Sequence, residues 1–245
     1  MKKKFIIGGV LTLISVMGVV AYLVFQGIFI PNQFSADKYE IKGVDVASYQ
    51  GEIDWRELEK QNMKFAFIKA TEGSAFVDEY FSTNWMNANK TGMRTGAYHF
   101  FSFDSKGETQ AKQYIRTVPK HKQALPPVID VEFYANKKDN PPHREDVEKE
   151  LTVMVKMLEK HYDKKVILYA TQEAYDLYIK DVYPQCDIWI RSILTKPSLS
   201  DERNWTFWQY TNRGRLRGYN GKEKYIDLNV LYGKEEEFEN YGMKD

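Results

Sequence analysis

Two acidic side chains, Asp130 and Glu132, close a short apolar run that begins at Pro127. Residues i and i+2 of a β-strand project to the same face, about 6–7 Å apart for a rise of about 3.3 Å per residue. Two carboxyl groups held this close, away from water, resist double ionisation, so one keeps a raised pKa and stays protonated near neutral pH. Hydrolysis of a glycosidic bond needs such a proton donor beside a second carboxylate. The pair therefore favours glycoside hydrolysis.

The elements that must position this pair follow from the pattern of apolar residues. Eight segments rich in Val, Ile, Phe and Tyr predict strands, and helices are expected between the earlier ones. This alternation predicts an α/β fold with a parallel sheet that closes into an irregular (β/α)8-type barrel. The last three strands leave little room for helices between them. The predicted strands cover residues 41–47, 65–70, 94–101, 127–132, 165–170, 187–191, 206–210 and 224–229, and the predicted helices cover residues 54–62, 79–91, 107–118, 144–162 and 172–180.

The carboxyl ends of barrel strands are where active sites lie, and here those ends carry acids and aromatic rings. A single strand-end acid is more often an ordinary paired or capping residue, but four acids on one barrel face favour a functional cluster. The predicted catalytic residues are Glu132, Asp130, Asp45 and Asp227. The predicted substrate-binding residues at the same strand ends are Lys69, Glu72, Tyr98, Phe100, Tyr169, Trp189, Trp208 and Gln209.

Several other kinds of chemistry are disfavoured by the sequence. A carboxylate cluster can bind a hard cation, but the four histidines show no ligand spacing, and neither a nucleophile elbow nor a phosphate-binding loop is present. We therefore predict no metal site. Cys186 is the single cysteine, so no intramolecular disulfide forms. The 35 Lys and Arg against 34 Asp and Glu give no bulk reason to expect nucleic acid as a partner.

The amino terminus has the pattern of a membrane segment. Three lysines, residues 2–4, precede an apolar stretch from Phe5 to Ile30, and spanning a bilayer takes about 20 residues. We predict an uncleaved transmembrane signal anchor over residues 1–30, a linker over residues 31–40 and a catalytic domain over residues 41–245; a cleaved signal peptide is the alternative. The lysines favour the cytoplasmic side. The prediction is therefore a single-pass protein of the cell membrane with its catalytic domain on the extracellular, wall side.

Six blocks of sequence, from about Lys42 to Leu231, resemble the glycoside hydrolase family 25 lysozymes. Their order and number make the resemblance specific. Tyr49 lies in the first block and joins the predicted substrate-binding residues. The blocks are residues 43–55 (GVDVASYQGEIDW), 65–73 (FAFIKATEG), 96–100 (GAYHF), 127–132 (PVIDVE), 205–210 (WTFWQY) and 226–229 (IDLN).

The resemblance implies cleavage of the β-1,4 bond between N-acetylmuramic acid and N-acetylglucosamine, so that peptidoglycan strands are the partner. It also implies that no cofactor is needed. Carried over by position, Glu132 is the general acid and Asp130 steers charge or orients the substrate N-acetyl group. Asp45 and Asp227 complete the acidic cleft, and Tyr98, Trp208 and Gln209 help to shape the sugar subsites.

Two residues depart from the family pattern. Ala47 stands where the family commonly has Ser, and Arg191 stands where it usually has Ala, which places a long cation near the groove. Two other functions stay open: a non-catalytic peptidoglycan-binding protein, and a glycosidase acting on another N-acetylhexosamine polymer. The sequence gives neither the separation of the two carboxyls, on which retention or inversion depends, nor the physiological role.

Overall fold

The computed structural model describes residues 2–243, in which the strands form one sheet. Their order is β1-β9-β8-β7-β6-β5-β4-β2-β3, and an additional pairing of β1 with β2 closes eight of them into a barrel, with β3 added to β2. The predicted eight-stranded barrel is therefore confirmed. The strands are β1 (Lys42–Val46), β2 (Phe65–Glu72), β3 (Phe76–Val77), β4 (Arg94–Phe100), β5 (Val128–Val131), β6 (Ile167–Thr171), β7 (Asp187–Arg191), β8 (Phe207–Gly214) and β9 (Ile226–Leu231).

The last strand corrects the prediction of a wholly parallel sheet. Strands β1, β2 and β4 to β8 run parallel to their neighbours, but β9 is antiparallel to both β8 and β1. The chain between β8 and β9, residues 215–225, contains no helix. A parallel connection needs a crossover, usually a helix, so this short segment instead turns the chain back and β9 enters in the opposite direction.

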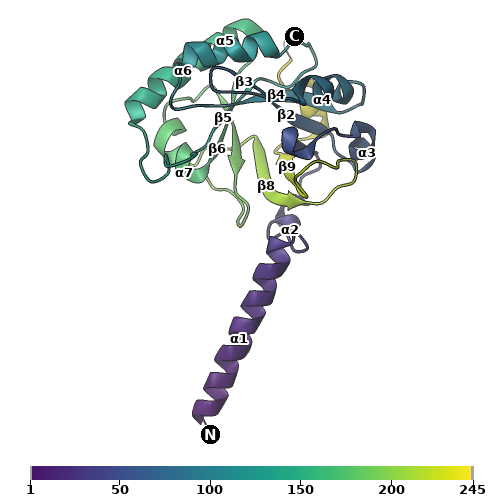
Figure 1. Ribbon diagram of the computed structural model, residues 1–245, viewed down its shortest axis with the longest axis vertical. Helices are drawn as coiled ribbons and strands as arrows, with labels where there is room; N and C mark the ends of the chain where they lie inside the picture. Colours follow the sequence, from purple (N-terminus) through teal and green to yellow (C-terminus); the bar gives the residue numbers. More distant parts are fainter. Residues whose placement is uncertain (1, 244–245) are drawn as a thin grey trace.

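Helices surround the barrel (Figure 1). The predicted helices are present but mostly shorter: α4 ends at Ala88, where the Asn89 amide bonds back to the Trp85 carbonyl oxygen at 2.8 Å, and the last one becomes α7 followed by a π-helical segment. The helices outside the amino terminus are α2 (Gln33–Ala36), α3 (Trp55–Lys60), α4 (Phe81–Ala88), α5 (Gly107–Thr117), α6 (Arg144–Tyr162), α7 (Gln172–Ala174) and α8 (Glu235–Asn240), with a 3₁₀ turn over Ser48–Gln50 and the π-helical segment over Tyr175–Ile179.

The core has two layers because side chains alternate along each strand. One set fills the barrel interior, where Phe67 stacks on Trp189 with ring centroids 4.6 Å apart. The other set packs between the sheet and the helices. Gly43 and Gly96 make room for the interior rings, since a Cβ at either would lie 2.5 or 2.6 Å from a phenylalanine carbon. The interior layer thus forms a solid floor beneath the mouth of the barrel.

Helix α1 (Lys2–Phe25) projects away from the barrel (Figure 1). No helix in the described part of the chain is long and apolar enough to cross a membrane, so the predicted transmembrane helix is not found. The segment predicted as a linker lies against the barrel. Asn32 donates to the Ser192 carbonyl oxygen at 2.8 Å, and Ala36 is fully buried. The barrel end of α1 is held by Arg213, which donates to the Phe25 carbonyl oxygen at 2.8 Å.

Replacing Phe67 by Ala is expected to remove one of the main contacts of the interior layer. Phe67 is fully buried and touches Trp189, so the cavity left behind should lower the free energy of unfolding by about 3–5 kcal/mol. Urea unfolding followed by tryptophan fluorescence measures this change. The control is Met86→Ala, at a side chain that is 54% exposed, and an equal effect of both variants would contradict the layered core.

Candidate active site

Asp45 and Asp227 lie side by side at the mouth of the barrel. They are register partners of the antiparallel pair β1 and β9, which brings the beginning of β9 to the carboxyl end of β1. The Gln209 amide donates to Asp45 Oδ2 at 2.9 Å and to Asp227 Oδ2 at 3.2 Å. The Asn229 amide donates to Asp45 Oδ2 at 2.7 Å. Two amides from β8 and β9 therefore fix this acidic pair.

Asp130 and Glu132 reach the same mouth from β5. Asp130 is within the strand and only 7% exposed, and its Oδ1 makes no hydrogen bond with any residue in the described range 2–243. Glu132 follows the last residue of the strand and is half-buried, beside the hydroxyl of Tyr169. That hydroxyl also donates to Gln209 Oε1 at 3.0 Å, so Tyr169 connects the two pairs of acids.

Burial raises the pKa of all four carboxyls above the ordinary values for Asp and Glu. After burial, the charge of Glu132 adds most to the rise at Asp130, and the charge of Asp45 adds most at Asp227. Arg191 opposes the rise in the pKa of Glu132, and more weakly that of the aspartates on β1 and β9. The site can therefore hold a protonated carboxyl close to ionised ones, as acid catalysis at a glycosidic bond requires.

A hollow of about 380 Å³ lies over these acids. It brings together all four predicted catalytic residues and all but one of the predicted substrate-binding residues. The lining residues are Asp45, Val46, Ala47, Tyr49, Gln50, Lys69, Glu72, Tyr98, Phe100, Asp130, Glu132, Tyr134, Tyr169, Trp189, Gln209 and Asp227.

Trp208 is the predicted substrate-binding residue that the structure places elsewhere. Its neighbours Phe207 and Gln209 point into the barrel, so alternation turns Trp208 to the outer side. There it is fully buried, and its indole N–H donates to the Ser192 carbonyl oxygen at 2.9 Å. Trp208 therefore packs the sheet against its outer layer and does not line the groove.

One wall of the groove is built from aromatic rings around a lysine. The Lys69 ammonium forms an ion pair with Glu72 at 2.7 Å and lies 5.2 Å from the ring centre of Phe100 and 5.5 Å from that of Phe76. Phe76 belongs to β3, which the sequence did not predict. At the rim, Tyr49 is 62% exposed. Exposed rings of this kind offer flat apolar surfaces to the faces of sugars.

Sequence reasoning missed three residues of this site. Asn229 bonds Asp45 and accepts the indole N–H of Trp189 at 2.9 Å; its position two residues after Asp227 on one strand was a usable signal. Gln50 and Tyr134 also line the hollow. The Tyr134 hydroxyl donates to a carboxylate of the loop before α5, at Asp104 (2.8 Å), so its place depends on a loop contact that local sequence does not reveal.

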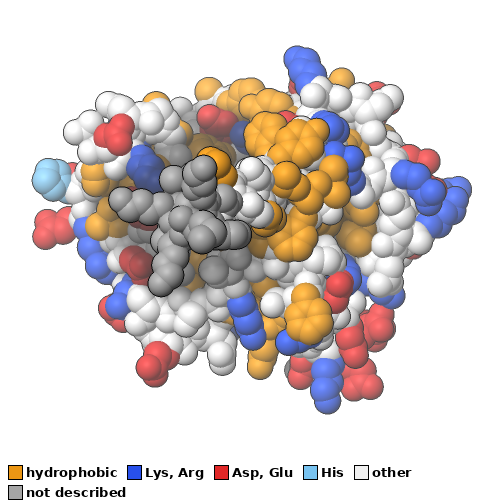
Figure 2. Space-filling model, turned by 90° about the horizontal axis from the view of Figure 1, so that it is seen from below, with side chains coloured by type: hydrophobic (Ala, Val, Ile, Leu, Met, Phe, Trp, Pro, Cys, Tyr) orange, Lys and Arg blue, Asp and Glu red, His pale blue; other side chains and the backbone are white. Residues whose placement is uncertain are grey.

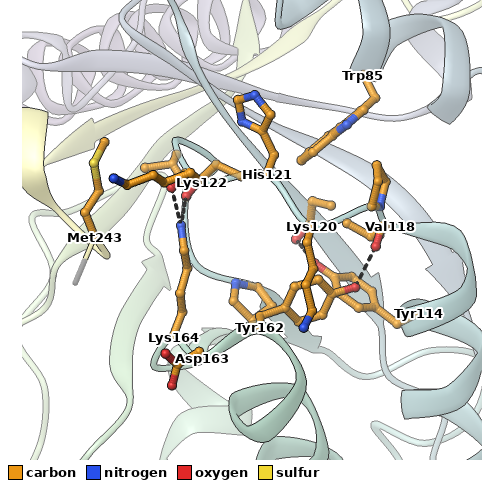
Figure 3. A pocket seen from close by; sticks show the side chains of 15 residues that line it. Trp85, Tyr114, Val118, Lys120, His121, Lys122, Tyr162, Asp163, Lys164 and Met243 are labelled. Carbon is orange, nitrogen blue, oxygen red and sulfur yellow. Dashed lines mark hydrogen bonds between the residues drawn. The ribbon is translucent and has the colours of Figure 1, made fainter. Parts of the chain in front are cut away.

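A second cavity, of about 300 Å³, lies away from the acids, where the loop after α5 meets the turn between α6 and β6 (Figure 3). Its walls are largely aromatic and apolar, including Trp85, Tyr114 and Tyr162. The labelled Lys164 turns its ammonium to backbone, donating to the Lys122 carbonyl oxygen at 3.0 Å. This cavity has one acid, Asp163, and so lacks the paired carboxyls that hydrolysis of a glycosidic bond requires.

A closed barrel with four carboxyls gathered over one groove is an arrangement that suits a glycoside hydrolase. The sequence model described as "Glycosyl hydrolases family 25" matches residues 44–219. The chain belongs to this family.

Three relatives illustrate the likeness. The solved structure of a family 25 glycosyl hydrolase from Bacillus anthracis is 88% identical with a TM-score of 0.81, over 84% of this chain and 95% of that one. A bacterial lysozyme from Streptomyces coelicolor is 26% identical with a TM-score of 0.75, over 82% and 96%. The Lysozyme M1 of Streptomyces globisporus is 29% identical over 81% of this chain and 70% of its own length.

Neutralising Asp130 is expected to stabilise the protein at neutral pH. Its folded pKa lies above the unfolded value, so this group favours the native state fully below about pH 3.9, and that contribution is lost as the pH rises through the folded pKa. Asp130→Asn should therefore raise the unfolding temperature at pH 7 by about 2–4 °C for each kcal/mol relieved, and the difference should vanish near pH 3.

Thermal unfolding followed by circular dichroism at both pH values measures this difference. The matched control is Asp139→Asn at an exposed position of the loop after β5, which should leave the unfolding temperature unchanged. A lower unfolding temperature for Asp130→Asn at pH 7 than for the unaltered protein would contradict the electrostatic account of the site.

Proposed function

We propose that this protein is a muramidase that hydrolyses the β-1,4 bond between N-acetylmuramic acid and N-acetylglucosamine in peptidoglycan. The observation that carries the proposal is the set of four carboxyls, two of them buried and two half-buried, in one groove of a family 25 chain. The Streptomyces globisporus relative is named as a lysozyme, which supports the same substrate. The groove is open and its rim carries exposed aromatic rings, which suits an extended polymer of sugars.

In the proposed reaction, Glu132 donates its proton to the oxygen of the leaving sugar. Burial raises the pKa of Glu132, which keeps the proton available above the range of an ordinary glutamate, while Arg191 limits the rise. The hydroxyl of Tyr169 lies beside the carboxyl and restricts its orientation. As the bond breaks, positive charge develops on the sugar ring, and the neighbouring carboxylates are placed to stabilise it.

Asp130 is proposed to orient the substrate. Its buried Oδ1 makes no hydrogen bond to any residue between 2 and 243, and a buried carboxylate oxygen gains stability from a donor. The N–H of a substrate acetamido group is such a donor. Asp45 and Asp227 are held by Gln209 and Asn229 at a fixed place on the far side of the groove floor, where they supply negative potential.

Replacing Glu132 by Gln is expected to abolish catalysis while leaving the fold intact. The amide keeps the shape of the side chain but cannot donate a proton to the leaving oxygen, so kcat should fall by about 10²–10⁴-fold. Release of reducing ends from purified peptidoglycan measures this loss, and mass analysis of the fragments identifies the bond. The control is Glu145→Gln at an exposed position of α6. Full activity of Glu132→Gln would refute its role as general acid.

The same assay separates the two other functions. A non-catalytic wall-binding protein would bind peptidoglycan and release no reducing ends at any pH. A glycosidase of another N-acetylhexosamine polymer would digest chitin in preference to peptidoglycan. Four acids with raised pKa values argue for turnover, because withdrawing carboxyls from water lowers the stability of the fold and binding alone does not require it.

We also propose that α1 attaches the barrel to the cell membrane, with the barrel on the wall side. The described residues contain no membrane-spanning helix, so this proposal rests on the exposed apolar side chains of α1 and on the lysines at positions 2–4. Leu11 and Leu13 are each 60% exposed, and Val20 is 44% exposed. In the view along α1, hydrophobic side chains gather near the centre of the face and charged ones lie toward its edge (Figure 2).

Replacing Leu13 and Val20 by Lys is expected to release the protein from membranes, because two ammonium groups on α1 oppose its burial among lipid chains. Centrifugal fractionation of cells, followed by immunodetection of the protein in each fraction, measures this change. The control places the same residue at Leu194→Lys, an exposed leucine of the barrel that should not alter the distribution. Recovery of the unaltered protein in the soluble fraction would contradict membrane attachment.

A further inference from the structure

Lys69 and Arg191 lie at opposite sides of the barrel mouth. In the closed order of strands, three strands separate β2 from β7 in either direction: β4, β5 and β6 one way, and β1, β9 and β8 the other. Lys69 is on β2, and Arg191 is the last residue of β7. The four carboxyls come from strands between these two positions, so each side of the acid cluster faces one cation.

The two cations differ in what they already bind. Lys69 forms an ion pair with Glu72 at 2.7 Å, with aromatic rings around its ammonium. In the described part of the chain, the Arg191 guanidinium is engaged in no hydrogen bond or ion pair, although it is half-buried. A guanidinium carries five N–H donors in a fixed fork. Arg191 therefore keeps its donors available for a ligand, whereas Lys69 is used within the protein.

The position of Arg191 directs its side chain to the mouth. Ile188 and Ile190 of β7 belong to the outer layer, and Trp189 belongs to the barrel interior and lines the groove. Arg191, two residues after Trp189, has the same orientation. Its register partner on β8 is Gln209, which bonds Asp45 and Asp227. Arg191 is the last residue of β7 and is half-buried, next to groove-lining residues but not among them, which places it at the edge of the groove.

The charge of Arg191 reaches the acids without a direct contact. It lowers the pKa of Glu132, which follows β5, and those of Asp45 on β1 and Asp227 on β9. These are the titratable groups that its charge affects most within the mouth, together with Tyr169 on β6. None of these groups forms an ion pair with Arg191, so a carboxylate arriving with the substrate would find the N–H donors of the guanidinium unoccupied.

We propose that Arg191 is a specificity-determining residue that binds a carboxylate of the substrate at the rim of the groove. This inference rests on the proposed function and deepens it. Peptidoglycan strands carry carboxylates on the peptides attached to the lactyl group of muramic acid, whereas chitin is uncharged. The planar fork of a guanidinium matches a carboxylate through two parallel hydrogen bonds. Arg191 would then select strands that bear an anionic substituent beside the bond to be cleaved.

The test compares one peptidoglycan preparation before and after its carboxylates are converted to neutral amides by carbodiimide coupling to a neutral amine. For the unaltered protein, kcat/KM should fall about tenfold on amidation, because a neutral amide keeps one acceptor oxygen but loses the charge and the second of the two parallel hydrogen bonds. Arg191→Ala should lose about tenfold on the untreated strands, mainly through KM, and should not distinguish the two preparations. Arg191→Lys should recover part of the difference, because it keeps the charge and loses the fork.

The matched control is Arg56→Ala, an exposed arginine of α3 that does not line the groove, which should discriminate as the unaltered protein does. Thermal unfolding checks that each variant is folded. The inference is overturned if Arg191→Ala still prefers untreated strands by the same factor as the unaltered protein. This includes the result that the substitution shifts only the pH profile of kcat, which would mean that Arg191 acts on the pKa values of the groove acids and not on the substrate. Failure of the unaltered protein to cleave either preparation would instead count against the proposed function.

Discussion

Strand β9 enters the sheet antiparallel to both of its neighbours, and the arrangement of the catalytic groove follows from that reversal. Asp227 is the second residue of β9, so a parallel strand would place it at the opposite end of the barrel from the other acids. The antiparallel register instead sets Asp227 beside Asp45. The same reversal aligns Asn229 with Gln209, and the two amides hold the acidic pair from one side.

Four carboxyls partly withdrawn from water lower the stability of the folded protein, and the packing of the barrel interior beneath them offsets this loss. The barrel interior beneath the acids is packed with rings, including the stacked pair Phe67 and Trp189. Trp189 also takes part in the site, because its indole N–H donates to Asn229, which in turn donates to Asp45. The core and the acid cluster are therefore continuous. A rigid floor limits how far the carboxyls can separate, and this keeps their pKa values raised.

The two cations at the mouth divide the groove electrostatically. Lys69 moderates the pKa of Asp130, and Arg191 moderates that of Glu132 and of the pair on β1 and β9. Without these two cations, repulsion between the carboxylates would raise the pKa values of the acids further. Lys69 is neutralised locally by Glu72, but Arg191 is not. The groove thus has an ion-paired lysine on the β2 side and an arginine without an ion pair within the described residues on the β7 side. This difference would affect the binding of a polymer that carries carboxylates more than that of an uncharged one.

The sequence by itself determined the eight barrel strands, the closed barrel and the choice of the four acids, because hydrophobic alternation and strand-end chemistry are local patterns, but it did not reveal the short strand β3. Placing Asp45, Asp130 and Glu132 at the carboxyl ends of parallel strands predicts that they meet in one groove, whereas Asp227 joins them only because β9 is antiparallel. Only the tertiary structure decided the direction of β9, since that depends on how residues 215–225 turn rather than on the strand itself. It also decided that Trp208 faces outward and Gln209 inward, because one position along a strand reverses the face. The place of Tyr134 was likewise set by a contact between loops distant in sequence, which no local pattern records.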